Sequence, residues 1–513
     1  MVVASFFAFM AIIVYFHYKT LVSYPPVFVD ESWNANAAWN WSRTGVNFDP
    51  MHSGTLDQAG YEWLRRPNLG TLPWVSVFTI AGVGLLQARL VSYFFGILLL
   101  AAVILVGKRF FRLTTGLLAA LFVSLSTPFI ISSHYARQDI ILAAVVMGLL
   151  GLAVWVFDND RLWPHLILGL CLGLTPDIHQ NGILFFPGFF SLYLFHYRQR
   201  ILRRYEFWLW LAGCLVGLLY FLYIHILPSP QAYLLYLSMN DVMLQNATGM
   251  SHSPPILSLN LMELLRSAYN ELGRFHFREN SLDFALIFAG AVFIGLRRQK
   301  SDPVFMTFLL VTYVSFVLLQ GNKVDFYGIL TYPLYLLLVA ESLVSLISDP
   351  ESKYLQRIFA LCLAAIFIIN SFRHYLQPSN GDRNYDYTAV TREITPLLRP
   401  DDRILATPTW WLGLTEYDYK SAFMISHNYY FNDLSVLGSM EKIAPTVLIV
   451  DDVFLSIFGA TELPVKDSVV NNTLSKKELM DFIDCCTEMI HMINTTQYGD
   501  LVIYRVVNSP WVR

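Results

Sequence analysis

The sequence predicts a polytopic α-helical membrane protein with a small α/β domain at its C-terminal end. Of its 513 residues, 55% are hydrophobic and 14% are charged, whereas a soluble domain carries roughly 25% charged residues. The apolar residues form runs of about 18 to 22 residues, long enough to cross a bilayer. After about residue 377 the composition changes to that of an ordinary soluble domain.

This composition excludes several classes of protein. A soluble cytosolic enzyme would not carry so many long apolar runs. Aromatic residues make up 15% of the chain, which is the opposite of a disordered composition. The formal net charge of −3 offers no basic surface, so no nucleic-acid partner is expected. The five cysteines show no metal-ligand spacing.

About eleven segments are predicted to span the membrane. The first lacks a basic region before it and a small-residue cleavage site after it, so we interpret it as a retained helix rather than a signal peptide. The segment 163–176 is short enough to be broken or re-entrant. The predicted spans are 4–22, 88–107, 113–132, 140–157, 163–176, 181–197, 207–227, 281–297, 303–320, 325–346 and 357–376.

Basic residues in the short loops predict the orientation of these spans. Threading the chain back and forth places three basic clusters on one side, which the positive-inside rule assigns to the cytoplasm. The loop 23–87, with interfacial helices, then lies outside, as does everything after about residue 377. We therefore expect a transmembrane module at 1–376 and an extracytoplasmic α/β domain at 377–513.

Alternating patterns in the tail predict the elements of this outer domain. Helices are expected at 386–398 and 475–490, and β-rich runs at 403–407, 446–450 and 501–507. Strands interleaved with helices are typical of a small α/β domain.

Two consecutive acids directly after the first span form the first candidate site. The segment 27–33 brings Asp30 and Glu31 to the membrane surface. Charges beside a span are costly unless they are solvated or functional. Asp30 or the neighbouring Ser32 could instead cap an interfacial helix at 34–43, and this alternative stays open.

A short outer turn carries the second candidate site. His134, Arg137 and Asp139 lie within six positions of one another. Asp139 could simply begin the next helix, and Arg137 could extend its charge to the interface. Three such residues are nonetheless a dense polar cluster for a turn this short.

Two further outer turns carry His179 and Lys323. The first turn, 176–182, interrupts a weak pair of spans, and the second, 321–327, joins two long spans and contains Tyr327. Each could be a plain solvated turn. Together the four outer segments bring carboxylates and cations to one membrane face. Carboxylates can act as general bases toward a hydroxyl, and cations can stabilise a phosphate leaving group.

The order of these motifs resembles that of a known family, the GT-C-fold glycosyltransferases of the protein O-mannosyltransferase and aminoarabinose-transferase type. This is glycosyltransferase family 39, which includes the dolichyl-phosphate-mannose-protein mannosyltransferases. The segment DESWNANAAWNWSRTG is similar to the family's first outer loop, and QARL, HYARQDIILA and NKVDFYGILTYPLYLLL are similar to three later motifs. The resemblance covers about residues 1–375. Its segments are 30–45, 87–90, 134–143 and 322–338.

The resemblance implies transfer of a sugar from a polyprenyl-phosphate-linked donor to a hydroxyl-bearing lipid, glycan or protein acceptor on the outer face. It implies an inverting single displacement with Asp30 as the base, and with Glu31 and Asp139 as supporting acids. No metal or other cofactor is predicted, although the sequence leaves a divalent cation open. The candidate substrate-binding residues are Arg137, Lys323, His179, Arg89, His134 and Tyr327.

The chain departs from related patterns at two places. The family often has Thr-Lys-Gly in a turn where this chain has IHQNG, so His179 would be a partial substitute for the lysine. The segment TWWLG resembles the Trp-Trp-Asp motif of oligosaccharyltransferases, but Leu412 replaces the required acid. We therefore expect Trp410 and Trp411 to pack the outer domain rather than to act in catalysis.

Two other functions are left open. A multi-span transporter or lipid flippase would need functional charges midway along its spans, whereas the charges here gather at one membrane face. A non-catalytic assembly protein would bind its partner through the 377–513 domain, and the acids near the membrane would be dispensable.

Overall fold

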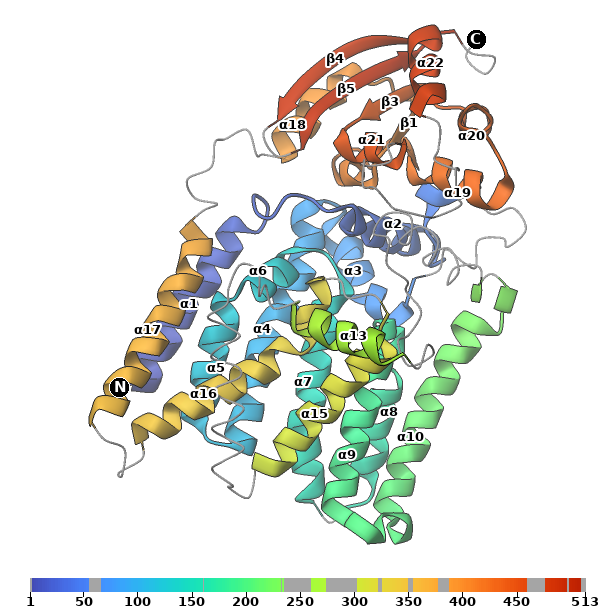
Figure 1. The fold of residues 1–513 in the computed structure, drawn as a ribbon. Helices are drawn as coiled ribbons and strands as arrows, with labels where there is room; N and C mark the ends of the chain where they lie inside the picture. The colour runs from blue at the N-terminus through green and yellow to red at the C-terminus, as the bar shows by residue number, and fades with distance from the viewer. Residues whose placement is uncertain are drawn as a thin grey trace.

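The protein has a helical part and a sheet part, which Figure 1 shows one above the other. A bundle of long helices forms the lower part, and a five-stranded sheet with its own helices covers one end of the bundle. This computed structural model describes residues 2–54, 66–159, 161–231, 233–234, 260–273, 302–321, 325–348, 354–376, 387–458, 476–495 and 498–508.

Long apolar helices make up the bundle. Among the described residues, three are long and apolar enough to cross a membrane: α4, α7, and α10 together with the π-helical turn η6 (Leu222–Ile226). A fourth candidate is the pair α5 and α6, which is bent by 68°. The helices of the bundle are α1 (Val2–Thr20), α4 (Leu85–Phe110), α5 (Leu113–Leu125), α6 (Thr127–His134), α7 (Gln138–Phe157), α8 (Trp163–Gly173), α9 (Phe186–Tyr197), α10 (Tyr205–Phe221), α15 (Asp302–Leu319), α16 (Tyr332–Ser348) and α17 (Tyr354–Leu376).

The bundle differs from the sequence prediction at several spans, two of which show clear breaks. The predicted span 113–132 is two helices, because Ser126 caps a new helix by accepting a bond from the Phe129 amide and Pro128 follows at its start. The predicted span 325–346 becomes α-helical only at Tyr332, after the 3-10 helix η7 (Asp325–Leu330). The predicted span 281–297 lies outside the described residues.

Short elements cover the end of the bundle nearest the sheet. Helix α2 begins before the expected helix at 34–43, so Asp30 and Glu31 lie in its first turn. It ends at Gly45, whose φ of +76° is left-handed and whose N–H donates to the Trp41 carbonyl. These elements are α2 (Val29–Thr44), η1 (Pro50–His52), α3 (Asn68–Ala81), η3 (Thr175–Asp177), η4 (Gln180–Phe185) and α13 (Leu261–Gly273).

The C-terminal part contains the expected mixture of strands and helices. The strand order is β2-β1-β3-β5-β4, in which β1 pairs in parallel with β2 and β3, and β5 pairs antiparallel with β3 and β4. The helix expected at 475–490 ends at Cys486, where β4 begins. The elements are α18 (Tyr387–Ile394), η10 (Thr395–Leu397), β1 (Arg403–Ala406), η11 (Pro408–Gly413), β2 (Asp418–Ser421), α19 (Phe423–Asn432), α20 (Val436–Ile443), β3 (Val447–Val450), α21 (Asp452–Phe458), α22 (Lys476–Cys486), β4 (Thr487–Thr495) and β5 (Gly499–Val506).

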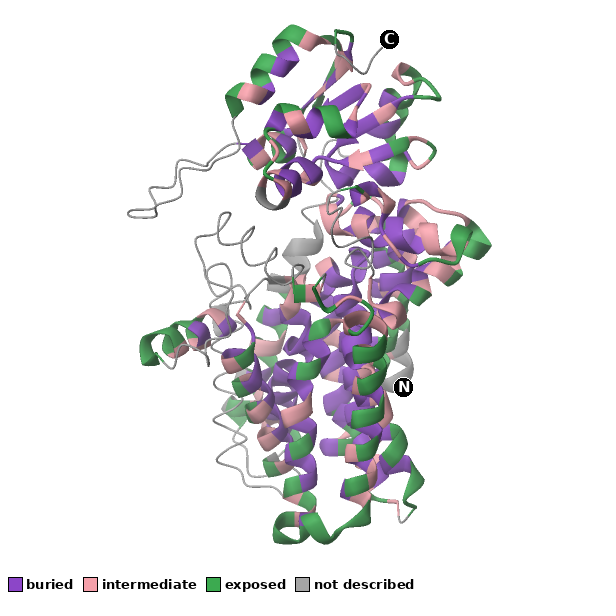
Figure 2. Ribbon diagram, turned by 90° about the vertical axis from the view of Figure 1, so that its right-hand side faces the viewer, coloured by how far each residue is buried: buried purple, intermediate pink, exposed green. Residues whose placement is uncertain are grey.

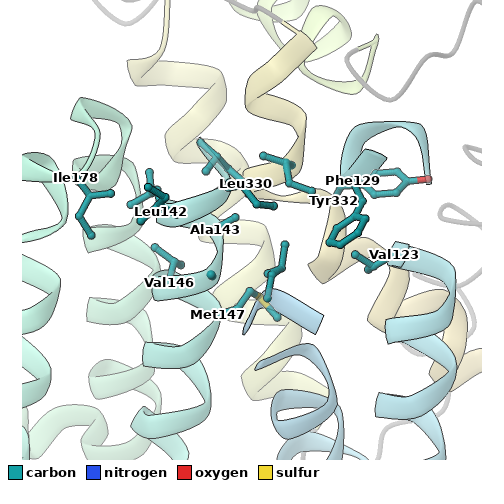
Figure 3. Packing of buried hydrophobic residues seen from close by; sticks show 14 of the residues in the cluster. Val123, Phe129, Leu142, Ala143, Val146, Met147, Ile178, Leu330 and Tyr332 are labelled. Atoms are coloured by element: carbon teal, nitrogen blue, oxygen red, sulfur yellow. The ribbon is translucent and has the colours of Figure 1, made fainter. Parts of the chain in front are cut away.

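The hydrophobic core runs from the bundle into one face of the sheet. Because side chains alternate along a strand, Ile404 and Ala406 of β1 belong to the cluster shared with the bundle, while Leu405 packs with α20 and α22 on the other face. Figure 2 shows buried residues along the inner sides of the helices and exposed ones on the outside. Figure 3 shows part of the core, where Leu142 and Val146 of α7 lie near Leu330.

The candidate acids and two of the basic loop clusters used to predict the orientation lie at opposite ends of the bundle. Helix α4 carries Arg89 in its first turns and Lys108 and Arg109 in its last turn. The basic turn η5 (Arg198–Arg203) joins α9 to α10 at the end of the bundle away from the sheet (Figure 1). Asp139, at the start of α7, lies at the sheet end.

Candidate active site

Glu31 forms a buried two-point ion pair with Arg89. Its Oε2 accepts from Arg89 Nε at 2.9 Å and its Oε1 accepts from Nη2 at 2.8 Å, and both side chains are fully buried. The carboxylate also accepts from the amides of Phe28 and Ala136, at 2.9 and 3.0 Å. Nη1 of Arg89 donates to the Leu21 carbonyl at 2.8 Å. The pair therefore joins α2, α4 and the turn before α7, and its polar atoms already have partners within the protein.

Asp30, the preceding residue, lies in a more open environment. Its side chain is 33% exposed, and its Oδ2 accepts from Nη1 of Arg137. Neighbouring residues on a helix point about 100° apart, which separates its surroundings from those of Glu31. Among the described residues, none donates to the second oxygen, Oδ1. Asp30 thus combines an oxygen held by Arg137 with a second oxygen that accepts from none of the described residues.

Arg137 connects Asp30 to the second candidate acid. Its Nε donates to Oδ2 of Asp139 at 2.8 Å, and its guanidinium carbon lies 4.4 Å from the centre of the Phe326 ring and 5.8 Å from that of Phe28. The aromatic rings stabilise the cation and fix its plane. Two carboxylates share one guanidinium, so the cluster of Asp30, Arg137 and Asp139 carries one unbalanced negative charge.

His179 extends this cluster toward η7. Its Nδ1 accepts from the Asn181 amide at 3.1 Å, which places the proton of the neutral ring on Nε2. Nε2 faces Oδ1 of Asp139 at 3.6 Å. Burial lowers the pKa of His179, although the Asp139 carboxylate acts in the opposite direction. The ring of Tyr327 packs edge-on against His179, with 5.3 Å between ring centres.

Two other predicted residues are placed differently. His134 is fully buried, and its Nε2 lies 3.3 Å from Nδ1 of His17, so it packs α6 against α1. Lys323 lies outside the described residues, so its predicted contact with the phosphate stays a prediction. The structure therefore brings together Asp30, Arg137 and Asp139 with His179 and Tyr327, and places Glu31 and Arg89 beside them in a separate buried pair.

Asp177, two residues before His179, is a buried acid that the sequence did not single out. Its carboxylate accepts from the amides of Asn68 and Leu69, at 2.8 and 3.1 Å, and so caps helix α3. It also pairs with Nε2 of His225 at 2.6 Å. Only a glycine fits at position 70, because a Cβ there would lie 2.2 Å from the Ile178 carbonyl. No local signal in the sequence pairs Asp177 with residues so distant.

The sheet part contacts the segment that carries Asp30. The amide of Val27 donates to the Tyr498 hydroxyl at 2.8 Å, and the Ser32 hydroxyl donates to the Thr409 carbonyl at 3.5 Å. These contacts lie on either side of Asp30 and Glu31 in the sequence. The sheet part of the protein therefore helps to position the start of α2.

The tryptophan pair of TWWLG packs the C-terminal part, as expected. Trp410 and Trp411 are buried, and Nε1 of Trp410 donates to Asp451 at 2.8 Å. Tyr387 stacks parallel to Trp410, with 5.8 Å between ring centres. In the described part of the chain, no group of three or more His, Cys, Asp or Glu side chains could hold a metal ion.

Comparison with known proteins shows what this fold and site resemble. Residues 72–226 match the family model described as dolichyl-phosphate-mannose-protein mannosyltransferase. This range contains Arg89, Asp139 and His179, whereas Asp30 precedes it. No curated protein sequence matches the chain.

Solved structures extend the likeness over the whole chain. ArnT from Cupriavidus metallidurans bound to undecaprenyl phosphate has a TM-score of 0.60 at 13% identity, covering 98% of both chains. Its apo form has a TM-score of 0.56 at 14% identity, covering 98% of this chain and 97% of ArnT. An Archaeoglobus fulgidus oligosaccharyltransferase tethered to an acceptor peptide has a TM-score of 0.52 at 11% identity. The match covers 87% of this chain and 69% of the oligosaccharyltransferase.

The protein is thus an integral, multi-pass membrane protein with an ArnT-like fold. Residues 72–226 match the protein mannosyltransferase family and the chain has the fold of ArnT, so the resemblance expected from its sequence motifs is confirmed.

Proposed function

We propose that this protein is a glycosyltransferase that moves a sugar from a polyprenyl-phosphate-linked donor to a hydroxyl-bearing acceptor at the outer membrane face. The observation that carries the proposal is Asp30, whose Oδ2 is held by Arg137 while its Oδ1 has no donor among the described residues. The undecaprenyl phosphate in the ArnT crystal structure supports this class of donor. The acceptor is a lipid, a glycan or a protein.

The proposed topology has about eleven spans within residues 1–376 and an extracytoplasmic domain at 377–513. The separation of the acidic cluster from the basic ends of α4 and α9 supports it, because cytoplasmic loops carry the excess of Lys and Arg. Under this topology the site around Asp30 faces outward, beneath the sheet.

The reaction is an inverting single displacement. The acceptor hydroxyl gives its proton to Oδ1 of Asp30 as its oxygen bonds to the anomeric carbon of the sugar. The bond from that carbon to the phosphate oxygen breaks, and its electron pair leaves with the polyprenyl phosphate. Asp30 accepts the proton through the oxygen that Arg137 does not hold, while Arg137 keeps the other oxygen in place.

The surrounding residues divide into positioning and substrate-binding groups. Glu31 and Arg89 position the start of α2, because their polar atoms are engaged with each other and with the backbone. Arg137 and Asp139 position Asp30. The phosphate and the sugar are held by the cluster's outer members, His179 and Tyr327, together with Lys323.

The test measures release of polyprenyl phosphate from a polyprenyl-phosphate sugar by the reconstituted full-length protein, with a membrane extract as the acceptor source. We expect Asp30→Asn to lower the rate about 10²- to 10⁴-fold, the usual range for losing a general base. The matched control is Asp418→Asn, which removes an exposed acid of β2. It should retain the wild-type rate.

Two results would contradict the proposal in different ways. Full activity of Asp30→Asn would remove Asp30 from the role of base but leave the donor class intact. No release from any polyprenyl-phosphate sugar by the folded wild-type protein would remove the donor class itself.

A further inference from the structure

A cavity of about 200 Å³ lies within the helical bundle, at the end away from the sheet. The last turns of α4, α7 and α9 and the first turn of α15 surround it. Its wall is largely apolar and includes Phe110, Phe157 and Leu192, while Arg109, Asp158 and His196 supply polar groups. No part of the proposed reaction uses this cavity.

The cavity and the candidate active site lie about one membrane thickness apart. Asp139 is in the first turn of α7, and Phe157, which lines the cavity, is the last residue of the same helix. Twenty residues at about 1.5 Å each make α7 about 30 Å long, which is about the thickness of the hydrocarbon core. Under the proposed topology, the cavity therefore lies at the cytoplasmic membrane interface.

The polar groups of the cavity have opposite charges that do not neutralise each other directly. Neither Arg109 nor Asp158 has an ion-pair partner within 4.0 Å among the described residues, and both are exposed. The His196 ring stacks on Phe157, with 4.7 Å between ring centres and 27° between planes. A positive charge at the C-terminal end of a helix interacts favourably with the helix dipole, which would explain Arg109 at the end of α4. The helix dipole does not explain Asp158, an acid at the C-terminal end of α7 beside an apolar cavity.

We propose that this cavity binds the headgroup of an aminophospholipid from the inner leaflet. The phosphate contacts the Arg109 guanidinium and the His196 ring, the primary ammonium contacts the Asp158 carboxylate, and the glycerol end packs on the apolar wall. A ligand with both charges satisfies both unpaired groups, whereas an anionic headgroup meets repulsion from Asp158 and the ends of the helices. Purely basic pockets between helices on the cytoplasmic side bind anionic lipid headgroups, and the Asp158 carboxylate distinguishes this cavity from them.

The experiment uses the full-length protein, stripped of lipid in detergent, with native mass spectrometry of bound lipid. Phosphatidylethanolamine, phosphatidylglycerol and phosphatidylcholine with matched acyl chains are titrated separately, and glycerophosphoethanolamine and inorganic phosphate test the headgroup without its chains. The variants are Arg109→Gln, Asp158→Asn and the control Lys108→Gln, which changes a neighbouring exposed base outside the cavity lining.

We expect the wild-type protein to bind phosphatidylethanolamine most tightly. One interfacial charge contributes about 1 kcal/mol, or about fivefold in affinity. Asp158→Asn should therefore remove the preference for phosphatidylethanolamine without weakening phosphatidylglycerol. Arg109→Gln should weaken all three lipids about fivefold, and Lys108→Gln should weaken none.

Three results would overturn the proposal. Tighter binding of phosphatidylglycerol than of phosphatidylethanolamine would make this an anionic-lipid site. Equal binding of all three lipids, or an unchanged preference in Asp158→Asn, would leave no role for the paired charges. Binding of inorganic phosphate as tight as that of the lipid would assign the cavity to a soluble anion.

Discussion

Asp30 and Glu31 are consecutive residues of one helix, but their carboxylates lie in contrasting surroundings. Glu31 is fully buried and accepts two bonds from Arg89 and two from backbone amides. Asp30 is one-third exposed and is held through one oxygen by Arg137. Two adjacent acids of one motif thus differ in function-relevant surroundings: one fixes the backbone, and the other stays partly exposed, as the proposed base requires.

The largest expected effect concerns the buried pair. Arg89→Met should lower the free energy of unfolding by about 3–5 kcal/mol, because Glu31 is left as an uncompensated buried charge. Thermal melting in detergent measures the change, and Arg403→Met, in an exposed pair with Asp418, is the matched control. The double variant with Glu31→Leu should recover part of the loss. A loss below about 1 kcal/mol in the single variant would mean that the pair is not structural.

Asp139→Asn tests whether Asp139 positions Asp30, the more exposed of the two adjacent acids, through Arg137. It weakens the contact that holds Arg137, and through it Asp30, so kcat should fall about 10- to 100-fold while KM changes little. Separate measurement of kcat and KM distinguishes this positioning role from substrate binding. A rise in KM with unchanged kcat would instead place Asp139 against the substrate.

Tyr498→Phe tests whether the sheet part positions α2. The Val27 amide would lose its acceptor, which should lower the free energy of unfolding by about 1 kcal/mol and reduce transfer several-fold. The control is Tyr417→Phe, whose hydroxyl makes only a long 3.5 Å bond at an exposed position. Unchanged activity and melting in Tyr498→Phe would show that this contact does not position the site.

The smallest effect is a pH dependence from His179. Its pKa is lowered in the folded protein, mainly by burial, so below the unfolded value of about 6.5 the unfolded chain binds the proton more readily. Stability from this group is therefore present above about pH 6.5 and decreases as the pH falls below it. The melting temperature of His179→Gln should fall less between pH 7 and pH 5 than that of the wild type. Parallel curves would mean that His179 does not contribute.

Local patterns in the sequence predicted much of the fold. Long apolar runs predicted most of the bundle helices, and β-rich runs predicted β1, β3 and β5. Strand β2, with its charged sequence DYKS, carries no comparable signal. The break at Ser126 was also missed, because an apolar run reports length and hydropathy but not the capping and proline effects that bend it.

Only part of the candidate site could be predicted from the sequence. Asp30, Arg137 and Asp139 stand out because charges are rare beside a span. The roles of Glu31 and Asp177 could not be predicted, because their partners are remote in the chain: Arg89 is 58 positions from Glu31, and Asn68 is 109 positions from Asp177.

The sequence by itself determined the class of protein, the bundle and the short list of acids and bases, because hydropathy and charge are local properties that a membrane constrains strongly. Tertiary structure decided which acid stays open and which is neutralised. It also brought Arg109 and Asp158 to one cavity. Those outcomes depend on distance between remote residues and on the loss of water around them, and neither can be read from one position in the chain.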